Sequence, residues 1–303
     1  MTKKKYYIYL IFVTLMWGLT PVTTAYFYDY MSGTVYGALS AIISAVSFTA
    51  IAWRKRKLID RKYLKVAVWT GLAFSIAVIL QMIGLQYTTP SMYAFLGNTS
   101  CVVVPILMLV LVKRKLHPLS IVAGPLCLLG CFIISNLGPG NAIGIGEILC
   151  ALAGVFFAFN IVGTGEYAKD LDVSVYLMIQ KWIHTVTSVT VMLVLYFIRV
   201  DGKALEEITF RWQPGILFWL IIHILIHVSF CWALRIKAAQ NINAVVIAVT
   251  MPFSAVITMV ISALLGMETF TLKYIIGGGI ILVSVIMSGV IEGRNKNQLH
   301  QED

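Results

Sequence analysis

Long apolar segments recur along the whole chain and constrain its fold more than any other feature of the sequence. Hydrophobic residues make up 59% of the chain and charged residues only 12%, whereas soluble domains contain about 25% charged residues. A segment of about 20 mainly apolar residues is long enough to cross a lipid bilayer as a helix. The composition therefore predicts an all-α integral membrane protein, with the lipid bilayer as its first partner.

About ten apolar segments are predicted to span the bilayer, and short links join them. They cover residues 6–27, 33–53, 66–87, 91–112, 118–137, 147–167, 172–199, 214–234, 238–267 and 270–291. The clearest break between them is the glycine-rich stretch 138–146, which favours turns. We therefore expect two five-helix halves, residues 1–138 and 147–303.

The basic residues predict the orientation of these helices, because cytoplasmic loops carry an excess of lysine and arginine. With the N-terminus in the cytoplasm, the inside segments collect Lys3, Lys4, Lys5, the seven basic residues from Arg54 to Lys65, Lys113, Arg114, Lys115, Lys169, Arg235, Lys237, Arg294 and Lys296. The outside segments keep Arg199, Lys203 and Arg211, with Lys273 near a helix start. We expect a multi-pass plasma-membrane protein, bacterial in type, with both termini in the cytoplasm. The net charge of +10 then reflects anchoring to anionic lipid and not binding to nucleic acid.

A weak internal repeat supports the division into halves. Residues 84–105 and 233–252 occupy the same place in each half, begin with a small residue and leucine, and end on a proline. With five helices per half, the second copy enters the membrane from the opposite side, which is a common plan among secondary transporters. Two such halves can expose one shared site to each side in turn.

Several short motifs give the chain a resemblance to a known family. They are Trp17–Gly18, Gly84–Thr88, Pro105, Pro252 and Leu265–Glu268. In order and spacing they resemble the drug/metabolite transporter superfamily, in particular its EamA-like ten-helix branch. The resemblance implies two inverted five-helix repeats. A Gly-Glu pair common in that branch is replaced here by Lys113–Lys115, and Pro252 lies farther from Glu268 than is typical. The resemblance therefore does not transfer the substrate of any one relative.

The function indicated is secondary transport of small metabolites by alternating access, with export as the expected direction. The sequence contains no nucleotide-binding P-loop, and the five cysteines lie in apolar segments without metal-ligand spacing. We therefore expect no cofactor and no enzymatic activity. A multidrug-type carrier of amphipathic compounds and a structural or sensory membrane subunit remain the alternatives.

Lys181 and His184 are the first candidates for a substrate-binding site. A charge at the bilayer centre costs about 3 kcal/mol, so a lysine inside a spanning segment needs a reason. Lys181 faces a cavity and holds an anionic group, or it reaches back to the membrane surface. His184 lies on the same face, either as a substrate- or proton-binding group or as a neutral histidine bonded to a neighbouring helix.

Further polar and aromatic residues lie at membrane depth and are candidates for the same site. His223 and His227 are four residues apart and form a polar stripe, although interhelical hydrogen bonding or a metal site would use the same spacing. The amides either line the cavity or join helices, and an indole offers a flat wall or ordinary packing. These candidates are Trp17, Gln81, Asn98, Asn160, His223 and His227.

No acidic residue lies in the middle of any predicted span. A proton-driven carrier of lipophilic cations commonly needs a buried carboxylate. Its absence, with Lys181 present, favours neutral, zwitterionic or anionic substrates such as amino acids. Proton coupling remains open, and so does a homodimer. The small-residue face around Gly277–Gly279 favours close helix packing, with a dimer contact as the alternative.

Overall fold

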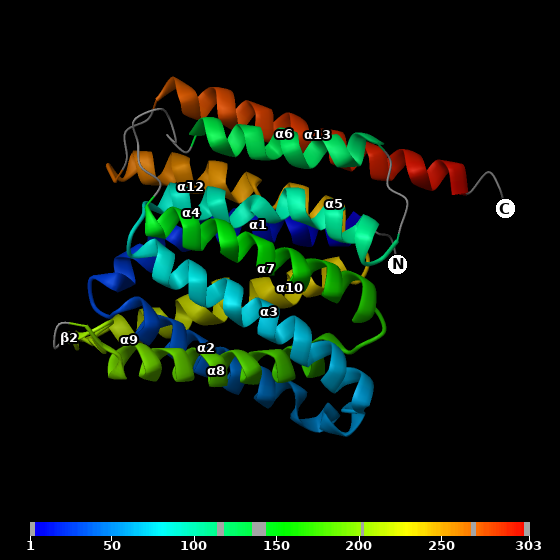
Figure 1. The fold of residues 1–303 in the computed structure, drawn as a ribbon. Helices are drawn as coiled ribbons and strands as arrows, with labels where there is room; N and C mark the ends of the chain where they lie inside the picture. Colours follow the sequence, from blue (N-terminus) through cyan, green and yellow to red (C-terminus); the bar gives the residue numbers. More distant parts are fainter. Residues whose placement is uncertain (1–3, 114–117, 135–143, 201–202, 268–270, 300–303) are drawn as a thin grey trace.

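The computed structural model describes residues 4–113, 118–134, 144–200, 203–267 and 271–299. Within these ranges the regular structure is helical apart from one antiparallel pair of two-residue strands, β1 (Arg199–Val200) and β2 (Lys203–Ala204), and an isolated antiparallel bridge between Met31 and Phe210. Eight described helical segments are long and apolar enough to cross a membrane, and two shorter apolar segments, Ile121–Gly130 and Leu272–Ser284, accompany them. The predicted all-α membrane fold with about ten spans is confirmed (Figure 1).

The described part of the first half contains six α-helices, and that of the second half contains seven. The first half holds α1 (Lys4–Tyr28), α2 (Gly33–Ala52), α3 (Arg61–Leu85), α4 (Pro90–Leu96), α5 (Ser100–Val110) and α6 (Pro118–Ile134), with 3-10 turns at Trp53–Leu58 and Gly97–Thr99. The second half holds α7 (Ile145–Tyr167), α8 (Val173–Phe197), α9 (Ile216–His223), α10 (Cys231–Ala239), α11 (Ala244–Thr250), α12 (Phe253–Leu264) and α13 (Leu272–Leu299). Most of the predicted glycine-rich break, together with Arg114, Lys115 and Glu268, lies outside the described residues.

Polar caps decide where several helices begin. The side chain of Asp60 accepts a hydrogen bond from the Tyr63 N–H, so α3 starts at Arg61, before the predicted residue 66. Thr89 caps α4 in the same way, with Pro90 at its first position. Such caps satisfy N–H groups that have no partner inside the helix.

The eighth span differs from its prediction at its end. It runs from Ile216 to Ala239 as α9, a π-helical turn at Ile224–Phe230 and α10, and it does not stop at residue 234. Arg235 therefore lies inside the helix and is only 2% exposed, so its assignment to a cytoplasmic link was wrong. An arginine is tolerated in a membrane helix when it faces the protein interior.

The helices of the two halves interdigitate, so that helices of one half pack against helices of the other. Three large helix contacts each join the halves, namely α3 with α7, α6 with α13 and α2 with α8 (Figure 1). The contacts are also symmetric between the halves, because a contact between two spans has a counterpart in which the two halves have changed places. The third span of the first half packs on the first span of the second (α3 with α7), and the first span of the first half packs on the third span of the second (α1 with α10).

The fourth and ninth spans are interrupted at the same place. α4 and α11 are each seven residues long, and each ends at a break before α5 or α12. The links before them, residues 86–89 and 240–243, are equal in length and place Gln86 opposite Gln240. The predicted alignment of Pro105 with Pro252 was therefore wrong: Pro252 lies in the second break, whereas Pro105 lies inside α5. The two copies share too few side chains to fix their register.

Candidate substrate-binding site

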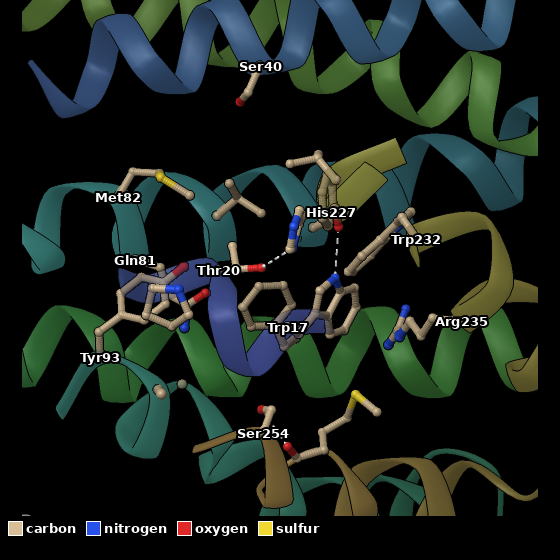
Figure 2. A pocket seen from close by; sticks show the side chains of 18 of the residues that line it. Trp17, Thr20, Ser40, Gln81, Met82, Tyr93, His227, Trp232, Arg235 and Ser254 are labelled. Carbon is tan, nitrogen blue, oxygen red and sulfur yellow. Dashed lines mark hydrogen bonds between the residues drawn. The ribbon is translucent and has the colours of Figure 1, made fainter. Parts of the chain in front are cut away.

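A cavity of about 170 Å³ lies between the halves, near the middle of the spans. Both helix breaks contribute to its wall, with Gly97 and Asn98 from the first and Met251 from the second. Figure 2 shows Trp17, Trp232 and Arg235 on one side of this space and Gln81, Met82 and Tyr93 on another. In transporters built from paired repeats, interrupted helices at matching positions mark the substrate site.

Six predicted residues line this cavity and two do not. The lining residues are Trp17, Gln81, Asn98, Lys181, His184 and His227. Asn160 lies behind the wall, where its Nδ2 donates to the Thr70 carbonyl and its Oδ1 accepts from Arg235. His223 also lies behind the wall, and its Nε2 is 3.0 Å from the Tyr36 hydroxyl.

Lys181 is fully buried in the cavity wall and does not reach the protein surface. Its Nζ has no hydrogen-bond partner among the described residues. It lies 4.3 Å from the centre of the Phe74 ring and 5.1 Å from that of Trp232. Aromatic faces attract a cation, but they do not supply the hydrogen bonds that an ammonium group makes in water. Lys181 is therefore positioned to receive an acceptor from a bound solute.

Arg235 is a second cation in the cavity wall, and the sequence analysis missed it. Its Nη1 donates to Asn160 Oδ1 at 2.8 Å, and its guanidinium carbon lies 4.6 Å from the centre of the Trp232 ring. The nearby Lys237 made the segment look like a charged loop. The signal that could have revealed Arg235 is its spacing of three residues from Trp232, which places both on one helix face.

Aromatic side chains make the rest of the wall beside Lys181. Trp17 stacks on Trp232 with ring centres 5.1 Å apart, and Phe74 packs 4.5 Å from the same ring. The Trp17 indole N–H donates to the His227 carbonyl at 2.9 Å, which fixes the plane of its ring (Figure 2). The cavity thus presents both flat apolar surface and positive charge.

Gly18 allows the close helix contact that positions Trp17. A Cβ atom at residue 18 would lie 2.5 Å from Ile257 Cβ and 3.1 Å from the Ser254 carbonyl oxygen. The Thr258 hydroxyl donates to the Gly18 carbonyl at 2.8 Å across the same contact between α1 and α12. Only glycine lets the two backbones come this close without displacing a neighbour.

The histidines are held in defined positions. His184 Nδ1 lies 3.2 Å from the Ser188 hydroxyl. His223 and His227 stack with ring centres 4.8 Å apart at the π-helical turn, a feature often found at functional sites. His227 Nδ1 lies 3.1 Å from the Met16 carbonyl, and because a carbonyl only accepts, that nitrogen carries the proton. No cluster of three metal-ligating side chains occurs in the part of the chain that the structure describes.

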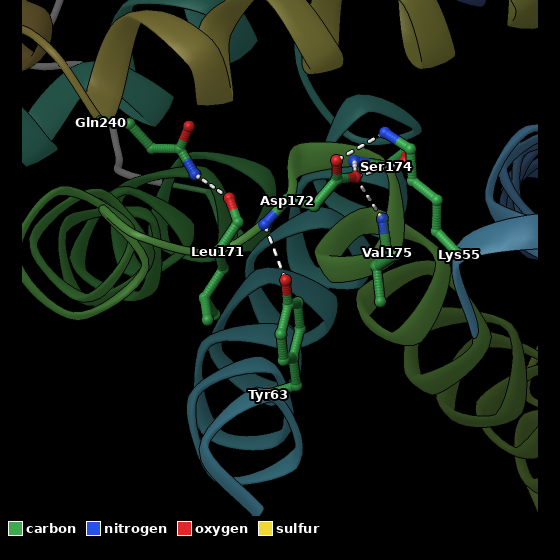
Figure 3. A network of polar contacts seen from close by, with 7 residues as sticks. All are labelled: Lys55, Tyr63, Leu171, Asp172, Ser174, Val175 and Gln240. Atoms are coloured by element: carbon green, nitrogen blue, oxygen red, sulfur yellow. Dashed lines mark hydrogen bonds and ion pairs between the residues drawn. The ribbon is translucent and has the colours of Figure 1, made fainter. Parts of the chain in front are cut away.

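Polar contacts join the halves at the end of the molecule that carries Lys55 (Figure 3). The Asp172 carboxylate caps α8 and accepts from Lys55 Nζ at 2.6 Å, and its backbone N–H donates to the Tyr63 hydroxyl at 2.8 Å. Nearby, Gln240 Nε2 donates to the Leu171 carbonyl at 2.9 Å. We call Lys55, Tyr63 and Asp172 the Asp172 latch.

Solvation and hydrogen bonding act on Asp172 in opposite directions. Partial burial alone raises the pKa of this carboxyl, but hydrogen bonds from Lys55, Ser174 and the Val175 N–H outweigh burial and lower the pKa below its ordinary value. The carboxylate is therefore charged at neutral pH, and the latch is formed.

A second latch joins the halves at the opposite end. Glu206, which follows β2, accepts hydrogen bonds from the Thr34 N–H at 3.0 Å and from Gln86 Nε2 at 3.3 Å. We call these three residues the Glu206 latch. The cavity therefore lies between two cross-connections, one near each end of the helices.

Comparison with known proteins adds two findings. The sequence profile described as the EamA-like transporter family matches residues 4–136 and again residues 144–290. A solved structure titled only "Crystal structure of protein" superposes with a TM-score of 0.74 at 11% identity, covering 97% of this chain and 99% of its own; at that identity the likeness concerns the fold alone. No match was found among curated protein sequences.

Proposed function

This chain belongs to the EamA-like transporter family, and we propose that it is a secondary transporter that moves small zwitterionic or anionic metabolites, such as amino acids, across the plasma membrane by alternating access. The interdigitated halves, the matching helix breaks and the two latches support alternating access, because opening either end requires that one set of contacts separate. Membership of the family makes the chain a membrane transporter; the substrate and the direction are our proposal.

The observation that carries the substrate class is Lys181. Removing an ammonium group from water is costly unless it is paired and hydrogen-bonded, and Lys181 has no hydrogen-bond partner among the described residues. A carboxylate in the cavity supplies both the charge and the acceptor. The cavity of about 170 Å³ is close to the roughly 150 Å³ that accommodates one benzene ring, which favours a solute of amino-acid size.

Export of an anion follows the membrane potential. With the cytoplasm negative, the potential favours outward movement of one negative charge by about 2.3 kcal/mol per 100 mV. His184 and His227 face the same cavity and are the groups through which proton coupling would act.

A carrier of amphipathic drugs is the second candidate, and the aromatic wall favours it. Trp17, Phe74 and Trp232 would pack against an apolar ring as readily as against a metabolite. Against it, the cavity is small and its cations oppose the positively charged compounds that such carriers commonly move.

Counterflow in proteoliposomes tests the proposal. Vesicles preloaded with an unlabelled amino acid or organic acid should accumulate the same labelled solute, and Lys181→Gln should abolish this exchange. Lys237→Gln is the matched control, because Lys237 is exposed on α10. Exchange that is equal in Lys181→Gln and in the unmodified protein would remove Lys181 from the site, and exchange of bulky cations in place of small acids would favour the second candidate.

A further inference from the structure

Two buried cations approach the same aromatic ring in the cavity. Lys181 from α8 is fully buried and Arg235 from α10 is 2% exposed. Their charged groups lie 5.1 Å and 4.6 Å from the centre of the Trp232 ring, so the separation of the two charges cannot exceed the sum of these distances. Both residues line the cavity, so one small solute can contact both.

The described lining of the cavity contains no carboxylate that would neutralise these two charges. Its polar side chains are amides, hydroxyls, imidazoles and the two cations themselves. Asn160, which bonds Arg235 from behind the wall, is also neutral. Two like charges in a medium of low polarity repel each other strongly, and the described residues of the cavity wall leave this positive charge uncompensated.

Arg235 retains the donors needed to bind an anion. A guanidinium carries five N–H groups in a planar fork, and the hydrogen bond to a side chain that the structure shows uses one of them, on Nη1. The remaining edge suits a carboxylate, which arginine binds through two parallel hydrogen bonds. Lys181 suits the same chemistry as a compact point charge.

We propose that the substrate of this transporter is a short dicarboxylate, with one carboxylate on Lys181 and the other on Arg235. The inference rests on the proposed transport function and narrows it from zwitterions and anions in general to dianions. Two negative charges compensate two positive ones, and a four-carbon chain is within the size that the cavity admits. The carbon chain lies along the Trp232 ring, between the two charged groups.

A simple zwitterion fits this cavity less well. Its carboxylate would find a cation, but its ammonium group would enter a space with two positive charges and, in the described lining, no acidic side chain. A monocarboxylate would leave one of the two cations without a counter-charge. Net charge is therefore the property by which this site discriminates among solutes of equal length.

Ligand binding to the purified protein tests the charge assignment directly. Trp17 and Trp232 line the cavity, so quenching of tryptophan fluorescence reports binding without requiring transport. The probes are four-carbon compounds of matched length: succinate, butyrate, 4-aminobutyrate and 1,4-diaminobutane. We expect succinate to bind at least about tenfold more tightly than butyrate, which corresponds to about 1.4 kcal/mol, and we expect no binding of the diamine.

Variants assign the second carboxylate to Arg235. Arg235→Gln should weaken succinate binding and leave butyrate binding little changed, so that the preference disappears. Lys237→Gln, on the exposed face of the same helix, should keep the preference. If Arg235→Gln does not fold, Arg235→Lys replaces it; it keeps the charge but loses the planar fork, and it should reduce succinate affinity while retaining the order of the ligands.

The outcomes separate this proposal from the transport proposal. Equal affinity for succinate and butyrate, tighter binding of 4-aminobutyrate, or a preference unaffected by Arg235→Gln would each overturn the dicarboxylate assignment. Counterflow of amino acids without counterflow of succinate would also overturn it and would leave the transporter standing. Counterflow of succinate that Arg235→Gln abolishes supports both.

Discussion

Replacing Lys181 with methionine should stabilise the ligand-free protein and weaken its binding of an anionic solute. A buried donor without a hydrogen-bond partner costs about 1–3 kcal/mol, and more when it is charged. The Phe74 and Trp232 rings, 4.3 Å and 5.1 Å away, offset about 2 kcal/mol of that cost. Methionine has a similar shape and no charge, so we expect a net stabilisation of about 1 kcal/mol. In a chain of 303 residues that raises the Tm by about 1.5 °C.

The same substitution removes a charge-assisted contact to the solute. Such a contact contributes about 1.5–3 kcal/mol, which is about 10- to 150-fold in Kd. Thermal unfolding of detergent-purified protein, with and without succinate, measures both effects in one series. Lys237→Met is the control and should change neither value, because that lysine is exposed. A variant that unfolds at a lower temperature than the unmodified protein and still gains stability from succinate would refute the reasoning for Lys181.

Three further predictions concern the latches and the helix contacts. Asp172→Asn keeps a helix cap, since asparagine caps well, but it loses the ion pair to Lys55. Labelling of a cysteine introduced at Ser254 in the cavity should therefore become faster. Asp170→Asn, at a side chain that is 84% exposed, should leave the rate unchanged. The pKa of Asp172 is lowered, so the contribution of this carboxylate to stability is complete above the ordinary pKa of about 3.9 and is lost as the pH falls through the lowered pKa. The Tm difference between Asp172→Asn and the unmodified protein should therefore be constant from about pH 5 to 8 and vanish at lower pH. A difference that already changes near pH 7 would contradict this. Gly18→Ala should destabilise the protein by about 1–3 kcal/mol through overpacking and reduce transport. Gly279→Ala is the control and should be tolerated, because no heavy atom lies within 4 Å of the new Cβ. Equal Tm values for the two variants would show that the α1–α12 contact can relax.

The helices were predictable because their signal is local. Apolar length and the positions of lysine and arginine are properties of contiguous segments, and the predicted spans agree with the observed helices within a few residues at most boundaries. The cavity residues Gln81, Asn98 and Lys181 were also predictable, because a polar side chain at membrane depth must face protein or water.

Other features depend on contacts between distant parts of the chain. Arg235 looked like a loop residue because an apolar segment gives way there to charge, and only the packing of α10 against the interior shows that the helix continues. The pairing of Lys55 with Asp172 spans 117 residues. No local sequence pattern reveals such a pair. The alignment of the first half with the second half was likewise not predictable without the observed helix ends.

That register has a consequence for how a solute is handled. Gln81 and Arg235 each lie four residues before the last residue of their helices, α3 and α10, and both line the cavity. The two residues thus occupy equivalent positions in the two halves, but one is a neutral amide and the other is a cation. Lys181 also belongs to the second half. A solute held by its negative charge would therefore stay bound to the second half throughout the transport cycle. It would cross the bilayer without reversing its orientation relative to that half.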